Sequence, residues 1–426
     1  MCSPPERNSG LLERSLSLVY SPPVTTTIGF DRCARYDPEE LSRAVRSVLE
    51  PLGGISSFVR RGDRVLIKPN IVAPGGPDTG VCTHPLFVRA VCDIVAGESP
   101  SRIRVGDLPG YNYLGATRRC LAESGLSGAL AGGPAETVLF ERAFSRVAGG
   151  RFRIFSHIDM TREIEEADVV ISLPKPKTHR LTLYTGAIKN MFGCVSYGTR
   201  QRIHKLGDYT AFCGGLVDIY DHIRPSLTIA DMVRVRQGNG PCGGRPLDVG
   251  VVFASADGVS VDAIGQFLLG FGPEEVLTTG LSRERGVGEG DLDRIDVVGP
   301  ADWRGSRTAA ARPARFYAWS NFRAPKPLFK SAAAFARVGP VFASGQCDLC
   351  RLCLEKCPGQ ALSIKNRSVR RDAKACRLCF GCVAACPRGA VSCRWDPFSA
   401  GLKFLDARSL RPVKNLIPKE SPESSS

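Results

Sequence analysis

The stretch from Cys347 to Pro387 constrains this chain more than any other part of its 426 residues. It holds two runs with the same spacing of four cysteines and a proline, C-x2-C-x2-C-x3-C-P. This spacing is typical of proteins that bind two four-iron clusters, in which the fourth cysteine of each run ligates the cluster of the other run. The sequence therefore predicts two [4Fe-4S] clusters, one on Cys347, Cys350, Cys353 and Cys386, and the other on Cys376, Cys379, Cys382 and Cys357.

Structural zinc and disulfide bonds are the alternative uses of these cysteines. Zinc sites usually combine two C-x2-C pairs, whereas here a third cysteine follows at the same step and the C-P ending is repeated. Disulfides need an oxidising compartment, and the N-terminus lacks the charged and apolar regions of a signal peptide. No apolar run approaches the roughly 18 residues that span a bilayer. We therefore expect a cytoplasmic protein with reduced thiols.

The net charge of +15 is confined to the last third of the chain, where residues 301–426 carry 23 Lys and Arg against 8 Asp and Glu. A basic cluster-binding module would attract an acidic surface, such as a small acidic redox protein or an anionic membrane face. A solvated basic face without a partner is the equally weighted alternative. Nucleic acid is a third candidate, which we rank low because no recognised nucleic-acid-binding motif accompanies the charge.

Strand and helix patterns alternate along residues 41–300. Helices are expected near 38–49, where Asp37 and Pro38 form a start signal, and at 83–95 with Thr83 as the cap, 114–124, 181–193, 211–223 and 258–270. Strands are expected at 63–70, 102–107, 151–156, 167–175, 226–231, 247–255 and 294–299. The uninterrupted V-V-I run of the strand at 167–175 is typical of a parallel strand that is buried on both faces.

This alternation predicts an α/β fold with a mostly parallel sheet and helices on both faces, followed by a small ferredoxin-type α+β domain that holds the two clusters. The predicted organisation is a polar lead-in at 1–40, the α/β domain at 41–300, a basic Ala/Arg/Pro linker at 301–340, the cluster domain at 341–395 and a polar tail at 396–426. The linker holds Trp303 and Trp319, so we expect it to pack in part through its aromatic side chains.

Polar residues follow the predicted strands where each strand ends, and functional groups in parallel sheets gather at these carboxyl ends. Four lysines are among them, Lys68, Lys175, Lys177 and Lys189. Two like charges at about 4 Å repel by about 4 kcal/mol at an effective dielectric constant of 20, so a shared site needs an anionic ligand or carboxylates. The candidate carboxylates are Asp107, Asp218, Asp231, Asp257 and Asp262, and solvent-exposed loop lysines are the alternative.

A family resemblance favours the shared site. The motifs K-P-N-I-V, T-H-P, G-D-L-P, A-D-V-V-I-S-L-P-K-P-K-T-H, T-G-A-I-K-N-M-F-G-C-V and D-G-V-S-V-D-A-I resemble, in their order, those of the domain-of-unknown-function family 362, which often carries a C-terminal two-cluster ferredoxin. The resemblance covers about residues 60–270 and continues through the cysteine runs. It implies one site, in which we assign catalytic roles to Lys175, Lys177, His179 and Lys189 and substrate binding to Lys68, Asn70, His84, Asp107 and Asn190.

The sequence departs from the family pattern after G-C-V. It reads S-Y-G-T-R-Q-R-I-H, where the family has a proline and a lysine before the histidine, His204 here. Arg200 and Arg202 are the candidates to replace that lysine.

Two functions fit these observations. The first is an oxidoreductase whose clusters exchange electrons with an anionic substrate or cofactor at the lysine-rich site. The second is an electron carrier whose α/β domain is a docking platform without catalysis.

Overall fold

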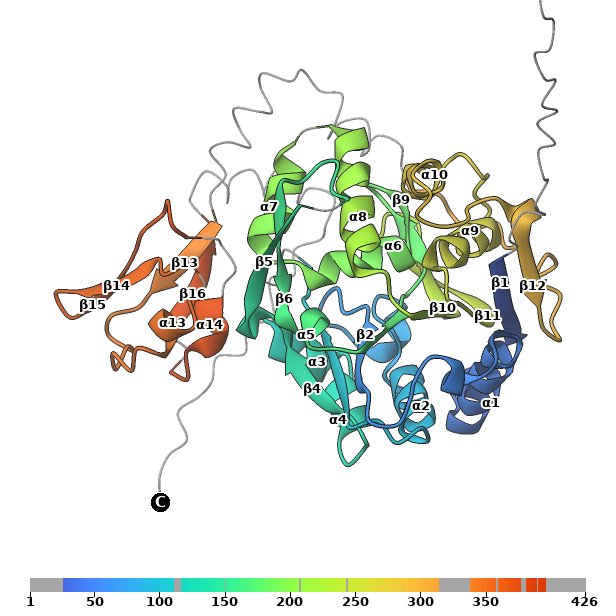
Figure 1. The fold of residues 1–426 in the computed structure, drawn as a ribbon, viewed down its shortest axis with the longest axis horizontal. Helices are drawn as coiled ribbons and strands as arrows, with labels where there is room; N and C mark the ends of the chain where they lie inside the picture. Colours follow the sequence, from blue (N-terminus) through green and yellow to red (C-terminus); the bar gives the residue numbers. More distant parts are fainter. Residues whose placement is uncertain are drawn as a thin grey trace, which may run out of the picture.

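An eight-stranded sheet forms the centre of the computed structural model, which describes residues 26–110, 116–149, 151–206, 208–242, 244–313, 338–357, 359–376, 381–388 and 390–395 (Figure 1). The strand order across the sheet is β12-β1-β11-β10-β7-β2-β3-β4. In chain order the strands are β1 (Thr26–Arg32), β2 (Arg64–Pro69), β3 (Arg102–Asp107), β4 (Glu136–Leu139), β7 (Val169–Leu173), β10 (Leu227–Gln237), β11 (Arg245–Ser255) and β12 (Ile295–Val298).

Most strand pairs in this sheet are parallel. The five adjacent strands β4, β3, β2, β7 and β10 run parallel to one another, and β12 runs parallel to β1. β11 lies between β1 and β10 and is antiparallel to both. Every residue of β7 is buried, as its apolar run predicts for a central parallel strand. The predicted α/β class with a mostly parallel sheet is confirmed.

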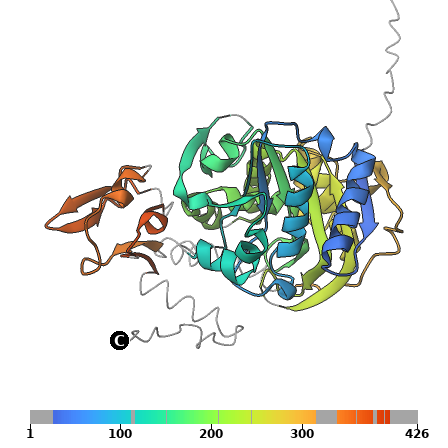
Figure 2. The ribbon, with the colours of Figure 1, turned by 90° about the horizontal axis from the view of Figure 1, so that it is seen from below.

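Helices cover both faces of the sheet. Val65 and Ile67 of β2 pack in one core with α1 (Pro38–Leu49) and α2 (Pro85–Ala96), whereas Leu66 between them packs in a second core with α8 (Tyr209–Ile223). A third core joins β1 and β11 to α9 (Gly258–Leu268). Figure 2 shows α1 and α2, in blue, on the side of the sheet that faces the reader. Shorter helices complete the layers: α3 (Thr117–Glu123), α4 (Leu126–Leu130), α5 (Arg162–Glu165), α6 (Ala187–Asn190), α7 (Tyr197–Lys205) and α10 (Leu277–Glu284).

Local signals placed several elements correctly. Asp37 caps α1 by accepting hydrogen bonds from the backbone N–H groups of Glu39 and Glu40, and Pro38 occupies the first turn. In the described part of the linker, the Trp303 ring packs on Phe267 with ring centroids 5.1 Å apart. Trp319 lies outside the described residues.

Four predictions of local structure were wrong, in each case because a contact with another part of the chain overrides the local sequence pattern. Residues 26–32, expected within a polar lead-in, form β1 between β11 and β12. His84 rather than Thr83 caps α2, since the Thr83 hydroxyl donates to the Leu173 carbonyl. Residues 151–156 are not a strand, because three of their N–H groups donate to one oxygen of Asp218. Residues 181–185 are not helical, since β9 (Leu183–Thr185) pairs with β8 (Lys177–His179).

The cysteine-rich region forms a small module with its own apolar core. Strand β13 (Val338–Phe342) pairs antiparallel with β16 (Val391–Trp395), and β14 (Leu362–Lys365) forms a hairpin with β15 (Ser368–Arg371). Two short helices, α13 (Leu352–Glu355) and α14 (Gly381–Ala385), complete the module. Residues 314–337 of the predicted linker and the predicted tail at 396–426 lie outside the described residues. Among the described helices, none has both the length and the apolarity needed to cross a bilayer.

Candidate functional site

The first lysine of the predicted site is neutralised inside the protein. Lys68 is fully buried near the end of β2, and its ammonium lies 2.7 Å from Oδ1 of Asp107 at the end of β3. The same ammonium donates to the Pro69 carbonyl and to Oδ1 of Asn190, both at 2.8 Å. An ammonium has three N–H donors, so Lys68 has none left for a ligand.

Lys175 has a similar environment on the neighbouring side. Its buried ammonium donates to Oδ2 of Asp231 at 2.8 Å and to the hydroxyl of Tyr36. The Tyr36 ring stacks on His84 with centroids 3.6 Å apart. Burial lowers the pKa of His84 to about 4, so this ring is neutral at pH 7. Lys175, Tyr36, His84 and Asp231 therefore form a closed polar cluster.

Lys177 is buried without a carboxylate partner among the described residues. Its ammonium donates to three neutral oxygens, Oδ1 of Asn70 at 2.6 Å, the Val81 carbonyl at 2.7 Å and the Lys175 carbonyl at 3.2 Å. Burial, assisted by the positive charge of Lys175, lowers the pKa of Lys177 to about 7. Lys177 contributes positive charge to its surroundings, but its donors are all used.

Lys189 differs from the other three lysines. It is half-buried, and within the described residues it makes no ion pair; its ammonium lies 6.0 Å from the centre of the Phe192 ring. Burial, with the nearby charge of Arg200, lowers its pKa to about 8. Lys189 is thus the one predicted lysine whose ammonium has donor capacity for a ligand.

Arg200, rather than Arg202, brings a second cation to this place. Two guanidinium nitrogens of Arg200 donate to the Leu108 and Pro109 carbonyls at 2.8 and 2.6 Å, while its buried Nε has no partner within the described part of the chain. Its guanidinium lies 5.3 Å from the centre of the Phe192 ring, which also contacts Lys189. Arg202 instead donates to the His157 carbonyl.

These residues border one small cavity at the carboxyl ends of β2, β3 and β7. It offers about 70 Å³ to the centres of water-sized molecules, which is room for a small group rather than a nucleotide. Among the described lining residues the one carboxylate is Asp107, which already accepts from Lys68 and from the backbone N–H groups of Ile71 and Leu108. The polar and aromatic residues that line it are Asn70, Asp107, Lys177, Thr185, Lys189, Asn190, Phe192 and Arg200.

The histidines of the region are electrically neutral. Nδ1 of His179 accepts hydrogen bonds from the backbone N–H groups of Leu181 and Thr182, both at 3.1 Å, which places the ring proton on Nε2. Burial and the charge of Lys189 hold the pKa of His179 well below its usual value. The same causes lower the pKa of His204 to about 4.

Residues 65–266 match the model of the family described as Domain of unknown function (DUF362). A Synechocystis protein named "Thylakoid-associated protein sll1697" is 33% identical over 262 residues, which cover 60% of this chain and 78% of that protein. The chain belongs to the DUF362 family.

A solved structure, that of the lactate racemase apoprotein from Thermoanaerobacterium thermosaccharolyticum, is similar over 54% of this chain and 54% of its own length. The sequence identity is 11% and the TM-score is 0.34, so the similarity indicates no shared function. The chain thus spans about half the length of that protein.

Within the DUF362 domain, the structure brings together most of the predicted site residues. Lys68, Asn70, Asp107, Lys177, Lys189 and Asn190 line the cavity or contact its lining. Lys175 and His84 belong to the adjoining cluster around Asp231, and His179 does not line the cavity. Sequence reasoning missed Tyr36, which lies outside the matched residues, and Phe192, whose role depends on two cations that only the fold brings to its ring.

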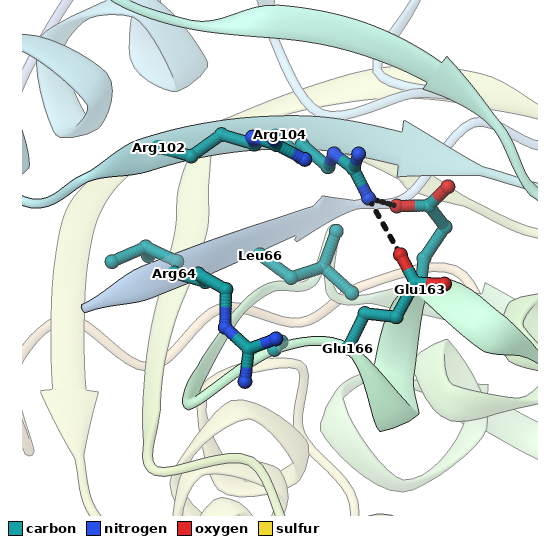
Figure 3. A pocket seen from close by; sticks show the side chains of 8 residues that line it. Arg64, Leu66, Arg102, Arg104, Glu163 and Glu166 are labelled. Atoms are coloured by element: carbon teal, nitrogen blue, oxygen red, sulfur yellow. Dashed lines mark hydrogen bonds and ion pairs between the residues drawn. The ribbon is translucent and has the colours of Figure 1, made fainter.

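A second pocket in the DUF362 domain is lined by charged side chains whose positive and negative charges pair with one another (Figure 3). It lies where β2 and β3 begin, at the opposite edge of the sheet from the cavity. Arg104 makes ion pairs with Glu163 at 2.8 Å and Glu166 at 3.0 Å, and Arg64 pairs with Asp168 at 2.7 Å. Because its cations already have partners, this pocket is a weaker candidate for a ligand site.

Beyond the DUF362 domain, the predicted first cluster ligands lie near one another. Burial and the nearby Cys347, Cys350 and Cys386 raise the pKa of the Cys353 thiol. The loop that carries the first three cysteines curls through left-handed backbone at Leu349 and Arg351, with φ of 59° and 64°. These four thiols have the donor chemistry that a [4Fe-4S] cluster requires.

For the second predicted set, the described part is incomplete. Cys382 is buried, Cys357 and Cys376 are half-buried, and Cys379 lies outside the described residues. The backbone N–H of Ala361 donates to Sγ of Cys357 at 3.3 Å, the kind of hydrogen bond to sulfur that tunes cluster potentials. In the described part of the chain no three His, Cys, Asp or Glu side chains converge on a point that suits a single metal ion.

Proposed function

We propose that this chain is an iron–sulfur electron-transfer protein in which two [4Fe-4S] clusters exchange electrons with a small anionic substrate or cofactor at the cavity beside Lys189. The observation that carries the proposal is the pairing, at one cavity, of two cations that have no carboxylate partner within the described residues, the ammonium of Lys189 and the guanidinium of Arg200. When bound, the clusters supply single electrons; the residues of the cavity supply binding and protons.

Charge balance favours an anion in this cavity. Asp107 and Asp231 neutralise Lys68 and Lys175, but within the described residues Lys177, Lys189 and Arg200 line the cavity without a carboxylate of their own. Like charges that share a partly buried site repel one another unless a counter-charge lies between them. An oxyanion in the cavity would offset this repulsion.

The cations differ in whether their hydrogen-bond donors are already used. Lys68 and Lys177 have used their donors, so they fix Asn70 and Asn190 and add positive potential. Lys189 and Arg200 are the residues that bind the anion directly. A lysine whose pKa lies near 8 can also give up or take a proton close to neutral pH, which suits a substrate whose basicity changes when electrons arrive. We therefore assign the catalytic role to Lys189 and a positioning role to Lys177.

A redox titration of anaerobically purified protein tests this proposal. Small carboxylates, phosphate and sulfate are added singly, and the reduced iron–sulfur signal is followed by electron paramagnetic resonance together with product analysis. We expect at least one anion to bind and to be reduced or oxidised at the expense of the clusters. Lys189→Met should weaken that binding about tenfold or more, since hydrogen bonds to charged groups contribute about 1.5–3 kcal/mol.

Arg61→Met is the matched control, because Arg61 is exposed and precedes β2, at the opposite end of that strand from the cavity. It should leave anion binding unchanged. If Lys189→Met changes neither anion binding nor electron exchange, while the clusters still reduce a separate carrier, the α/β domain is a docking platform and the catalytic proposal is wrong.

A further inference from the structure

The hairpin of β14 and β15 carries the densest run of positive charge in the described part of the cysteine module. Between Gly359 and Cys376 the sequence holds five cationic residues and a single carboxylate, Asp372; the cations are Lys365, Arg367, Arg370, Arg371 and Lys374. All five side chains are exposed. Figure 1 shows this hairpin as an arm of the module.

These cations have no acidic partners in the described part of the chain, which sets them apart from the arginines of the α/β domain. There, exposed arginines repeatedly pair with carboxylates, as Arg64 does with Asp168 and Arg119 does with Glu123. In the hairpin, Asp372 is occupied differently, since its Oδ1 accepts from the backbone N–H of Lys374. A positive field of this kind attracts anionic surfaces over distances up to about a Debye length.

The hairpin separates its apolar and charged faces. Ile364 pairs with Val369 across the two strands, and both belong to the module's core. Because side chains alternate along a strand, Lys365 and Arg370 lie on the opposite face. The turn has φ of 50° at Asn366 and 54° at Arg367, as in the tight two-residue turns that twist with the strands. Arg367 adopts this left-handed conformation although it costs a residue with a side chain more than it costs glycine. The tip of the hairpin therefore carries a positive charge.

The base of the hairpin is tied to two predicted ligands of the second cluster. On one side, the Ala361 N–H donates to Sγ of Cys357 at 3.3 Å. On the other, the Asp372 N–H donates to the Ala361 carbonyl at 2.8 Å, and the Cys376 N–H donates to the Asp372 carbonyl at 3.1 Å. The strands therefore connect the charged face directly to the Cys357 and Cys376 thiols, with Lys365 four strand residues, or about 13 Å, from the base of the hairpin at Ala361.

We propose that the outer face of this hairpin, Lys365, Arg367 and Arg370, is the docking surface for a small acidic one-electron carrier protein that exchanges electrons at the Cys357 and Cys376 site. This inference rests on the proposed electron-transfer function. One electron passes between carrier and site in each encounter, so that one is oxidised as the other is reduced, and no bond is made or broken. Opposite charges speed such encounters and set their orientation.

The test uses the full chain with its clusters and an acidic plant-type [2Fe-2S] ferredoxin as the probe. The variant Lys365→Glu/Arg367→Glu/Arg370→Glu is compared with Arg32→Glu/Arg61→Glu/Arg245→Glu, which makes the same charge change at exposed positions of the α/β domain. Affinity is measured by fluorescence anisotropy and the electron-transfer rate by stopped flow, each at several salt concentrations. We expect the hairpin variant to lose about tenfold or more in both, and the control variant to lose much less.

Methyl viologen, a small cationic reductant that needs no docking surface, separates this inference from the proposed function. If methyl viologen reduces the hairpin variant as fast as the wild type, the clusters are intact and the loss belongs to docking. Equal losses in the two variants, or none, would overturn the docking surface while leaving the electron-transfer function standing. Loss of binding to anionic phospholipid vesicles with unchanged ferredoxin kinetics would also overturn it, in favour of a membrane contact.

Discussion

The ammonium of Lys68 lies 2.7 Å from Oδ1 of Asp107, and both side chains are sealed from solvent at the ends of two adjacent parallel strands. This ion pair shows how the domain assembles several cations at one edge of its sheet. Lys68 and Lys175 each receive a carboxylate, whereas Lys177 and Lys189, which line the cavity, have none within the described residues. The unneutralised charge is thereby concentrated at the cavity, where a ligand can use it.

Replacing Lys68 should therefore destabilise the fold rather than only the site. Lys68→Met leaves the Asp107 carboxylate buried without its counter-charge, and breaking a buried pair in this way costs about 3–5 kcal/mol. Urea unfolding followed by circular dichroism measures the change. Adding Asp107→Asn to Lys68→Met should recover part of the loss, since it removes the stranded charge. An unchanged unfolding midpoint in Lys68→Met would show that the pair contributes nothing.

Gly193 is needed because a side chain there would enter the same ion pair. A Cβ atom at this position would lie 2.0 Å from Oδ1 of Asp107 and 2.7 Å from Nζ of Lys68. Gly193→Ala should lower the free energy of unfolding by about 1–3 kcal/mol or more, as overpacking does in a filled interior. The matched control is Gly280→Ala in α10, where a Cβ meets nothing within 4 Å and helix propensity favours alanine. Similar stabilities for the two variants would contradict this reading.

The sequence predicts those parts of the fold that local pattern determines. Asp37 and Pro38 define the start of α1 by capping chemistry alone, and the V-V-I run identifies β7 as a buried strand. β1 could not be found in this way. Its place depends on pairing with residues 251–254 and 295–298, more than 200 positions later, and its own seven residues carry no distinct alternation.

The sequence predicts which residues form the site but not what each of them does there. Strand ends and family motifs identified the four lysines, and Asp107 and Asp231 were among the carboxylates considered. Which lysine receives which carboxylate depends on side-chain geometry, so the distinction between Lys189 and the other three is visible only in the fold. Tyr36 gave no signal, because its role comes from stacking on His84, which lies 48 positions later in the chain.

The affinity for the anion should depend on pH through Lys189. Burial and the charge of Arg200 lower its pKa to about 8, so the ammonium that binds the anion is lost as the pH rises through 8. We expect the dissociation constant, measured by calorimetry from pH 6 to 10, to rise modestly near pH 7, where Lys177 loses its charge, and to rise toward tenfold per unit above 8. Lys189→Arg keeps its charge throughout and should remove the steep rise above pH 8. The same steep rise in Lys189→Arg would assign the effect to another group.

The free protein should show the opposite trend in stability. The native-state pKa of Lys189 is depressed relative to the unfolded chain, so between about pH 8 and the ordinary lysine value the unfolded state binds more protons. The free energy of unfolding therefore rises with pH across that window. Below pH 8 the cost of burying the charged Lys189 is present in full. Urea unfolding of the wild type and of Lys189→Met, without anion, should differ in slope between pH 8 and 10, with the flatter profile in the variant.

Removing a predicted ligand should cost iron without unfolding the α/β domain, because the cysteine module has its own core. Cys353→Ser takes away a buried thiol of the first predicted cluster, so iron content should fall from roughly eight to roughly four atoms per chain, as expected for two four-iron clusters. Iron analysis and electron paramagnetic resonance measure the loss, and far-ultraviolet circular dichroism checks the sheet. Cys242→Ser is the control, since Cys242 is an exposed thiol beside Pro241 at the cavity and not a predicted ligand. Full iron content in Cys353→Ser, or an equal loss of iron in Cys242→Ser, would refute the assignment of Cys353 as a cluster ligand.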